Sequence, residues 1–568
     1  MLVPSIYPTK SWSDELDNAK QLAEESGTSQ RQPLLNSLSL KSRNVFGTTS
    51  TSDLESMGPD TLDISADAKK IYRFIVGLDD GFPKVMTTEE VQNNLHDPFT
   101  RLLLAKGLFP LTTKAVVEEL EKTQGQDSGL ITRNVFLIGE GGKLPWDGTT
   151  DKVNRTFRFT FAIRINGGIG PDILISTGTN VESTKGFLQL MSWDPDLKGY
   201  HFFQRLGSLW IWSGNSYDAL NASTRHKGPF SGHINGGPVM KELEQPWQNW
   251  HSMNATIALP SHHPLQQNPY FQEKGTGDQF EKLVKTGMDK LNQARIERSI
   301  INGAVRDFDF FMRQILDSLN VNLISSIQES RAVQADDSLP LPFSFFANMA
   351  GFSLADIEPD IEQIKVRGNI YLQSLVDFDF ALITDGARIP GDTHFAFFVP
   401  EVSREDMNLL EKMIRHEMIS KKMVASILMV DFPNPLYSEK RKSLLQYVPN
   451  DIKAGNQGFH FDEVFIENIK RSGKIDDPNL PEGELVTNWS LENWQEVFES
   501  RLIAYFKNLK VKSETQEGYN NFVRVAEYRR KRFMTTPLYE FDLTFAKTNM
   551  DASQFPLTMH IDGTVAGS

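Results

Sequence analysis

A run of alternating residues near the middle of the chain restricts its fold more than any other feature. Between Thr156 and Ile165, large apolar side chains stand at every second position, with polar or small side chains between them. A period of two is typical of a strand with one buried face. Asn166-Gly167-Gly168 follows directly and is a natural reverse turn. We therefore predict a half-buried strand over 156–165 that ends in a turn.

Shorter segments continue this pattern downstream. They cover residues 173–176, 187–193, 200–206 and 209–213. The segment Asp194-Pro195-Asp196-Leu197-Lys198-Gly199 separates the second from the third and has strong turn chemistry. Short consecutive strands with tight turns favour an antiparallel meander, as either a sandwich or a barrel-like sheet.

The rest of the chain shows helical patterns. Thr87-Thr88-Glu89-Glu90 opens one helix with acidic residues where the helix dipole favours them, and 113–123 forms a second. Ser403 with Asp406 is a capping signature for a long helix that runs to about Met429. Further helices are expected at 278–301, 304–319, 490–509 and 515–532, and late strands at 375–383 and 538–546.

These patterns predict an α+β fold, in which a β-rich antiparallel central region packs with a large helix-rich C-terminal part. At 568 residues the chain is also too long for one ordinary core. We divide it into a mobile or draped arm, a helical segment, a β-rich region with His- and Trp-rich loops, and a helix-rich region with a few strands. Their bounds are 1–65, 66–128, 129–275 and 276–568.

The composition argues against several classes of protein. A formal net charge of −14 argues against a general nucleic-acid binder, which needs a basic surface. The lack of cysteine removes disulfides, thiolate metal ligands and a cysteine nucleophile. The sequence shows neither a signal peptide nor an apolar window long enough for a membrane span. A soluble, cytoplasmic protein is therefore predicted.

Residues 187–263 form the most unusual stretch of the chain. They contain six of the eleven histidines and five of the nine tryptophans, among glycines and prolines that no long helix tolerates. These residues are His201, His226, His233, His251, His262, His263, Trp193, Trp210, Trp212, Trp247 and Trp250. So many rings without a regular period are typical of packed loops that line a cavity.

Three histidines of this stretch are candidate metal ligands: His226, His233 and His251. Neutral imidazole is the commonest metal ligand in proteins. Gly228 and Gly232 free the backbone to bring the first two imidazoles together. The cofactor would be a divalent transition metal or a haem.

Neighbouring side chains complete this predicted site. Glu242 or Lys241 would transfer protons, while Trp247, Trp250 and Asn235 would line the pocket around the cofactor. The predicted function is a metal- or haem-dependent enzyme that acts on a small apolar or aromatic molecule. An oxidoreductase is preferred, because a chain without cysteine tolerates oxidants.

Two other interpretations stay open. In a carbohydrate-binding or carbohydrate-active module, Asp194 and Asp196 would contact hydroxyls or act as acid and base. The platforms that stack on the sugar rings would be Trp193, Trp210, Trp212 and Trp247. In a non-catalytic structural protein, the histidines would bond loop carbonyls and the tryptophans would fill the core.

Familiar motifs fail on inspection. Gly139-Glu140-Gly141-Gly142-Lys143 follows a strand but lacks the first glycine and the hydroxyl of a phosphate loop. His416 has Ser420 where a helical metalloprotease motif needs its second histidine. The basic run 529–532 is interpreted as complementing the dipole of its own helix. The acids Asp377 and Asp379 are interpreted as a solvated strand face.

Overall fold

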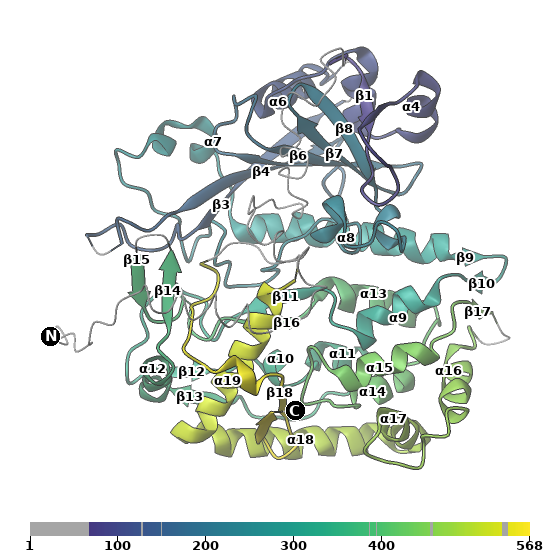
Figure 1. The fold of residues 1–568 in the computed structure, drawn as a ribbon, viewed down its shortest axis with the longest axis vertical. Helices are drawn as coiled ribbons and strands as arrows, with labels where there is room; N and C mark the ends of the chain where they lie inside the picture. The colour runs from purple at the N-terminus through teal and green to yellow at the C-terminus, as the bar shows by residue number, and fades with distance from the viewer. Residues whose placement is uncertain are drawn as a thin grey trace.

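The computed structural model describes residues 67–125, 129–148, 150–384, 387–393, 395–454, 458–536 and 543–567 (Figure 1). The predicted arm at 1–65 lies outside these residues, as does the first half of the late strand predicted at 538–546. In Figure 1 a sheet with its covering helices occupies one end of the molecule, and a helical half occupies the other.

An eight-stranded sheet forms the centre of the first half, with the strand order β2-β1-β8-β7-β6-β5-β4-β3. Its strands are β1 (Ile71–Arg73), β2 (Lys84–Val85), β3 (Ile131–Glu140), β4 (Thr156–Ile165), β5 (Ile173–Gly178), β6 (Leu188–Asp194), β7 (Gly199–Leu206) and β8 (Leu209–Asn215). Strands β3 to β8 form the predicted antiparallel meander, and β4 has the predicted bounds. Strand β1 joins the sheet parallel to β8. The predicted α+β fold is confirmed, as one sheet with β2 and β3 at its edges.

The prediction that β4 buries only one face is wrong. The side chains of Thr160 and Ala162, on the face expected to be polar, are as buried as that of Phe161 on the other face. The reason is that other segments cover both faces of the sheet. The register aligns Phe161 with Val135, so the next residue of β3, Phe136, points to the opposite face.

Each face has its own cover. On one face, Phe99 of α5 (Pro98–Leu102) packs edge-on against Phe203 and Trp210, with ring centroids 5.2 and 4.8 Å apart. On the other face, the ring of Phe280 on α8 (Gly277–Ser299) packs against the ring of Phe136, with centroids 4.8 Å apart. Figure 1 shows α8 running between the sheet and the helical half. The sheet is therefore an internal layer.

The helices near the sheet are α4 (Thr88–Asn94), α5, α6 (Thr113–Lys122), α7 (Pro269–Gln272) and α8. The helical half contains α9 (Phe308–Leu316), α10 (Phe343–Phe346), α11 (Met349–Leu354), α12 (Gly368–Asp377), α13 (Arg404–Arg415), α14 (Lys421–Leu428), α15 (Glu439–Ser443), α16 (Phe461–Lys470), α17 (Pro481–Ser490), α18 (Trp494–Ser513) and α19 (Gln516–Met534). Its short strands are β9 (Ile300–Ile301), β10 (Ala304–Val305), β11 (Val321–Ile324), β12 (Ser338–Pro340), β13 (Lys365–Arg367), β14 (Ala381–Thr384), β15 (Ala387–Pro390), β16 (Val399–Val402), β17 (Ile452–Lys453), β18 (Leu557–Met559) and β19 (Val565–Gly567).

The predicted helices over 278–301 and 515–532 are confirmed as α8 and α19, and Thr515 caps α19 through the backbone N–H of Gly518. The long helix expected from Ser403 is two helices, α13 and α14. It breaks where Glu417 takes a left-handed φ of 53°, and Ser420 caps the second helix. Ser490 ends α17 and does not begin α18.

Three other local predictions are also corrected. The segment 304–319 begins as strand β10 and becomes helical only at Phe308. Asp377 ends helix α12 and Asp379 lies in the following turn, so they do not share a strand face. Arg529 and Arg530 are buried in the core, where Arg530 pairs with Asp392 at 3.1 Å. In the residues that the structure describes, no helix has both the length and the apolar character needed to cross a membrane.

Candidate metal centre

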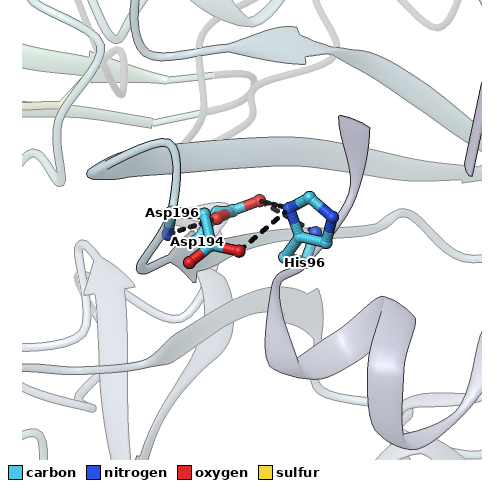
Figure 2. Close-up of side chains that lie close together, drawn as sticks. All are labelled: His96, Asp194 and Asp196. Atoms are coloured by element: carbon cyan, nitrogen blue, oxygen red, sulfur yellow. Dashed lines mark hydrogen bonds and ion pairs between the residues drawn. The ribbon is translucent and has the colours of Figure 1, made fainter. Parts of the chain in front are cut away.

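An imidazole and two carboxylates meet at the turn between β6 and β7 (Figure 2). His96 Nδ1 lies 3.3 Å from Asp196 Oδ2 and 3.9 Å from Asp194 Oδ2. Each residue offers one ligand atom, and these atoms all lie within 4.8 Å of one another. Across the described ranges, this is the one group of three or more such side chains close enough to share a metal ion.

Turn chemistry positions the two carboxylates. Asp194 is the last residue of β6, and its Oδ1 accepts the backbone N–H groups of Asp196 (2.8 Å) and Leu197 (2.9 Å). Lys198 then takes a left-handed φ of 54°, and Gly199 begins β7. Aspartate favours this kind of turn because its side chain bonds the backbone two residues on. The turn buries Asp194 completely and leaves the Asp196 side chain 72% exposed.

A second local motif holds His96 against this turn. His96 lies between Leu95, the C-cap of α4, and Asp97, whose carboxylate caps α5 by accepting the Thr100 N–H. The backbone N–H of His96 donates to Asp194 Oδ2 at 2.8 Å. This bond fixes the loop on the turn, and the imidazole, 41% exposed, lies beside both carboxylates.

Asp194 is held as an anion. Burial raises its pKa, but hydrogen bonds from the His201 ring and from the backbone N–H groups of Leu197 and His96 outweigh burial and lower the pKa to about 2. A carboxylate that accepts several N–H bonds is stabilised in its charged form. Asp194 therefore brings a full negative charge to the cluster at neutral pH.

His201 and Trp212 support Asp194 from inside the sheet. The Trp212 indole N–H can only donate, so His201 Nδ1, 3.0 Å away, must accept its hydrogen bond. The ring hydrogen of His201 is then on Nε2, which donates to Asp194 Oδ2 at 2.9 Å. Both bonds are satisfied by a neutral imidazole, and this buried pair fixes the orientation of the Asp194 carboxylate.

The tautomer of His96 can be assigned in the same way. Its Nε2 lies 2.8 Å from the carbonyl oxygen of Gln92, which can only accept, so Nε2 carries a hydrogen. In the neutral ring the Nδ1 lone pair then faces two carboxylate oxygens. Three electron-rich atoms at this spacing are stabilised by a proton or a metal ion between them.

The histidines predicted as metal ligands do not come together. His233 Nδ1 bonds the carbonyl of Gly237, four residues along its own loop. His251 Nδ1 accepts the Ile257 N–H at 3.3 Å. Burial lowers the pKa of His233 and of His251 to about 4 and also lowers that of His226. Among the described residues, no group of potential metal ligands contains His226, His233 and His251, and loop backbone groups bond His233 and His251 locally.

The predicted proton-transfer residues lie in two different surroundings. The Lys241 ammonium donates to Asn320 Oδ1 at 3.1 Å, on the side of the helical half. Glu242 Oε1 accepts the Asn249 N–H at 3.2 Å. Glu242 also interacts with Lys143, whose pKa burial lowers to about 7. The two residues are adjacent in sequence, and these hydrogen bonds lead to different partners, Asn320 for Lys241 and Asn249 for Glu242.

Asn235, a predicted pocket residue, belongs to a buried polar network in the helical half. Its amide donates to Asp406 Oδ1 at 3.2 Å. The neighbouring Glu405 Oε2 accepts from Asn320 at 2.9 Å. Burial raises the pKa of Asp406 well above its usual value, with a further rise from Glu405, and burial also raises the pKa of Glu405. Asn235 thus has a packing partner on α13.

The tryptophans fill the core. Trp250 stacks on Phe280 with centroids 4.5 Å apart, and the Trp247 N–H donates to Glu281 at 3.2 Å. Trp193, Trp210 and Trp212 lie in the sheet, and all five indoles of the 187–263 stretch are at most 6% exposed. Rings this buried cannot serve as platforms for sugar rings without a rearrangement of the core.

Two of the three residues of the candidate centre were predictable from the sequence. Asp194 and Asp196 were singled out for their turn, although with carbohydrate as the ligand. His96 was missed, since it lies far from them in the chain. A histidine directly before the helix-capping pair Asp97-Pro98 was the available signal, but such a pair does not indicate which turn it will meet.

Comparison of the chain with protein-family models, with curated proteins and with solved structures gave no match.

Proposed function

We propose that this protein binds a divalent transition-metal ion through His96, Asp196 and Asp194. The observation that carries the proposal is the orientation of His96. Its Nε2–H is committed to the Gln92 carbonyl, and its Nδ1 faces the two carboxylates. Metal-binding histidines in general donate their other ring N–H to a carbonyl or carboxylate in this way.

The spacing supports a shared ion. Two ligand atoms that each lie about 2.1 Å from one ion are at most about 4.2 Å apart. The separations of 3.3 and 3.9 Å from His96 Nδ1 are within that limit, and the three ligand atoms all lie within 4.8 Å of one another. One nitrogen and two carboxylate oxygens suit Mn²⁺, Fe²⁺ or Zn²⁺ better than the soft ions that thiolates select.

The hydrogen bonds of Asp194 also set the expected strength of the site. This carboxylate already accepts four N–H groups, so its lone pairs would be shared with the ion. His96 and Asp196 are the ligands with free capacity, and we expect micromolar rather than nanomolar affinity. Three protein ligands at an exposed turn leave room for water, which a bound ion would activate for reaction with a substrate.

Isothermal titration of the chelator-treated full chain with Zn²⁺ and with Mn²⁺ tests the proposal. We expect one site per chain, and affinity at least tenfold weaker in His96→Ala and in Asp196→Asn. The matched control is His460→Ala, because His460 is another exposed imidazole beside an acid, 3.8 Å from Glu463. Absence of a one-to-one site, or equal affinity in His96→Ala and His460→Ala, would contradict the proposed site.

Oxidoreductase activity, a small-molecule substrate, the absence of nucleic-acid binding and a cytoplasmic location stay predictions from the sequence. A redox role would require the bound ion to be Fe²⁺ or Mn²⁺ and not Zn²⁺. In a metal analysis of the protein purified without added metal, Zn²⁺ at this site would therefore contradict a redox role.

A further inference from the structure

A surface cavity of about 360 Å³ lies between helices α12 and α19 and the segment 549–555, which follows α19 in the chain. The two helices pack against each other in the helical half (Figure 1). The backbone N–H of Asn549 donates to the Phe378 carbonyl at 3.0 Å and holds the segment beside the end of α12. The volume of the cavity falls within the range of about 300–1,000 Å³ that is usual for small-molecule sites.

Charged groups of both signs line this cavity. They are one cation, Arg524 of α19, and two anions, Asp377 and Asp551. The Arg524 guanidinium donates to two neutral amide oxygens, that of Asn521 at 3.2 Å and that of Gln554. Among the described residues, none of the three charged side chains forms an ion pair within 4.0 Å. An ionic ligand can therefore meet opposite charges here that the fold has not already paired.

Both carboxylates of the cavity are exposed and accept hydrogen bonds from uncharged donors. Asp551 accepts the hydroxyl (2.6 Å) and the N–H (2.8 Å) of Ser553, and these bonds hold the pKa of Asp551 below its ordinary value. Asp377 accepts the side-chain amides of Gln373 at 2.8 Å and of Asn520 at 3.1 Å. Hydrogen-bond donors favour the charged form of a carboxylate, so the cavity presents two anions.

Half-buried apolar side chains form another part of the lining. Phe378, Met550 and Phe555 pack against the core of the helical half and also line the cavity. The Lys531 ammonium, paired with Glu527 at 3.5 Å, already lies 5.3 Å from the centre of the Phe555 ring. Aromatic faces attract cations, and apolar surface accommodates the methylene chain of an amine. The lining thus suits an aliphatic chain that carries cationic groups.

We propose that this cavity binds a free diamino acid, which has one carboxylate and two ammonium groups on an aliphatic chain. The ligand carboxylate displaces the Gln554 amide from the Arg524 guanidinium, because a bidentate charge-assisted pair is stronger than a neutral hydrogen bond. The two ammonium groups pair with Asp377 and Asp551, and the methylene chain lies on the half-buried apolar side chains. One cation and two anions in the lining match one anion and two cations in the ligand.

The probe for the test is L-lysine, titrated into the full chain in a calorimeter. Two analogues lack one group each, since L-norleucine has no terminal ammonium and 1,5-diaminopentane has no carboxylate. We expect one saturable site for L-lysine and at least tenfold weaker binding of both analogues. Absence of saturable L-lysine binding, or equal affinity for L-lysine and either analogue, would overturn the proposal. This comparison needs only the wild-type protein.

Two variants assign the charged groups. Arg524→Gln should weaken L-lysine binding at least tenfold but should not weaken the binding of 1,5-diaminopentane. Asp551→Asn should weaken the binding of both, because both carry two ammonium groups. The matched control is Arg471→Gln, which removes a guanidinium on the surface that bonds Glu467 and does not line the cavity. Thermal melting shows that the variants are folded. Equal L-lysine affinity in Arg524→Gln and Arg471→Gln would refute the site.

Discussion

Two pairs of neighbouring acidic residues in this protein lie in different surroundings. Asp194 and Asp196 lie in a turn whose backbone N–H groups point at Asp194. Glu405 and Asp406 lie at the first turn of α13, inside the helical half. Both Asp194 and Asp406 are buried, yet the pKa of Asp194 is lowered to about 2 and that of Asp406 is raised well above its usual value.

The difference shows that burial alone does not determine the charge of these acids. Asp194 accepts four N–H groups from the turn, the His96 loop and His201. Asp406 accepts an amide N–H from Asn235, while the carboxyl group of Glu405 lies beside it and raises its pKa further. Desolvation penalises the charged form of both, and only the number of donors at Asp194 outweighs that cost. A stable anion is available for a metal ion at one pair and not at the other.

The largest effect is expected from Asp194→Ala. This change leaves the His201 ring N–H and three backbone N–H groups without their acceptor, and should lower the free energy of unfolding by about 3 kcal/mol. Urea unfolding followed by tryptophan fluorescence measures it. Asp196→Ala removes an exposed carboxylate and should change the free energy by about 0.5 kcal/mol or less. Equal losses in the two variants would mean that the turn does not depend on Asp194.

The loss of stability at low pH tests the same difference between Asp194 and Asp406. The folded-state pKa of Asp194 is about 2, and its ordinary value is 3.8. The ionised Asp194 carboxylate therefore stabilises the folded state at pH values above 3.8, and this stabilisation is lost as the pH falls through about 2. This difference between the two pKa values corresponds to about 2.5 kcal/mol. Stability measured between pH 5 and about pH 1 should fall by about this amount more in the wild type than in Asp194→Ala. Parallel curves would contradict the assigned hydrogen bonds.

Asp406 should show the opposite dependence on pH. Its pKa is raised in the folded state, so its favourable contribution is present at low pH and is lost as the pH rises through the folded-state pKa. Each tenfold rise in the proton affinity of this carboxyl group corresponds to about 1.4 kcal/mol. Asp406→Asn keeps the oxygen that accepts from Asn235 but cannot ionise. Between pH 5 and pH 9 it should therefore lose less stability than the wild type, and identical pH profiles would refute this.

The smallest expected effect concerns the support of Asp194 by His201. His201→Leu removes the N–H that orients the carboxylate and should weaken Zn²⁺ or Mn²⁺ binding by about tenfold. His201→Gln should recover part of the loss, because its amide can donate to Asp194 and accept from Trp212. Titration calorimetry of both variants measures this. Equal weakening in both would point to lost packing and not to a positioning role of the hydrogen bond.

The sheet was predicted well because its signals are local. The alternation from Thr156 to Ile165 and the turn that begins at Asp194 depend on residues that are neighbours in the chain. The burial of both sheet faces was not predictable in this way. It depends on Phe99 and Phe280, which belong to helices before and after the meander. Local periodicity does not show which segment covers a face.

The candidate metal centre was not predicted from the sequence for the same reason. Density of histidine in one stretch suggested convergence, but loop carbonyls and N–H groups close to His233 and His251 satisfy those rings. The imidazole that does lie beside two carboxylates belongs to His96. In the sequence, His96 precedes strands β3 to β5, whereas the two carboxylates follow them. Arg529 and Arg530 show a similar limit, since their burial depends on Asp392 and on the carbonyls of Phe345 and Phe398.

The parallel pairing of β1 with β8 has a consequence for biosynthesis. Tyr72 pairs with Ile211, so β1 leaves the ribosome long before its neighbour has been translated. At about 5–20 residues per second, the wait is on the order of ten seconds. Throughout that interval, β2 is the one native sheet neighbour that β1 can pair with, through Tyr72 and Val85. The earliest-made strand of the sheet is thus among the last to reach its place beside β8.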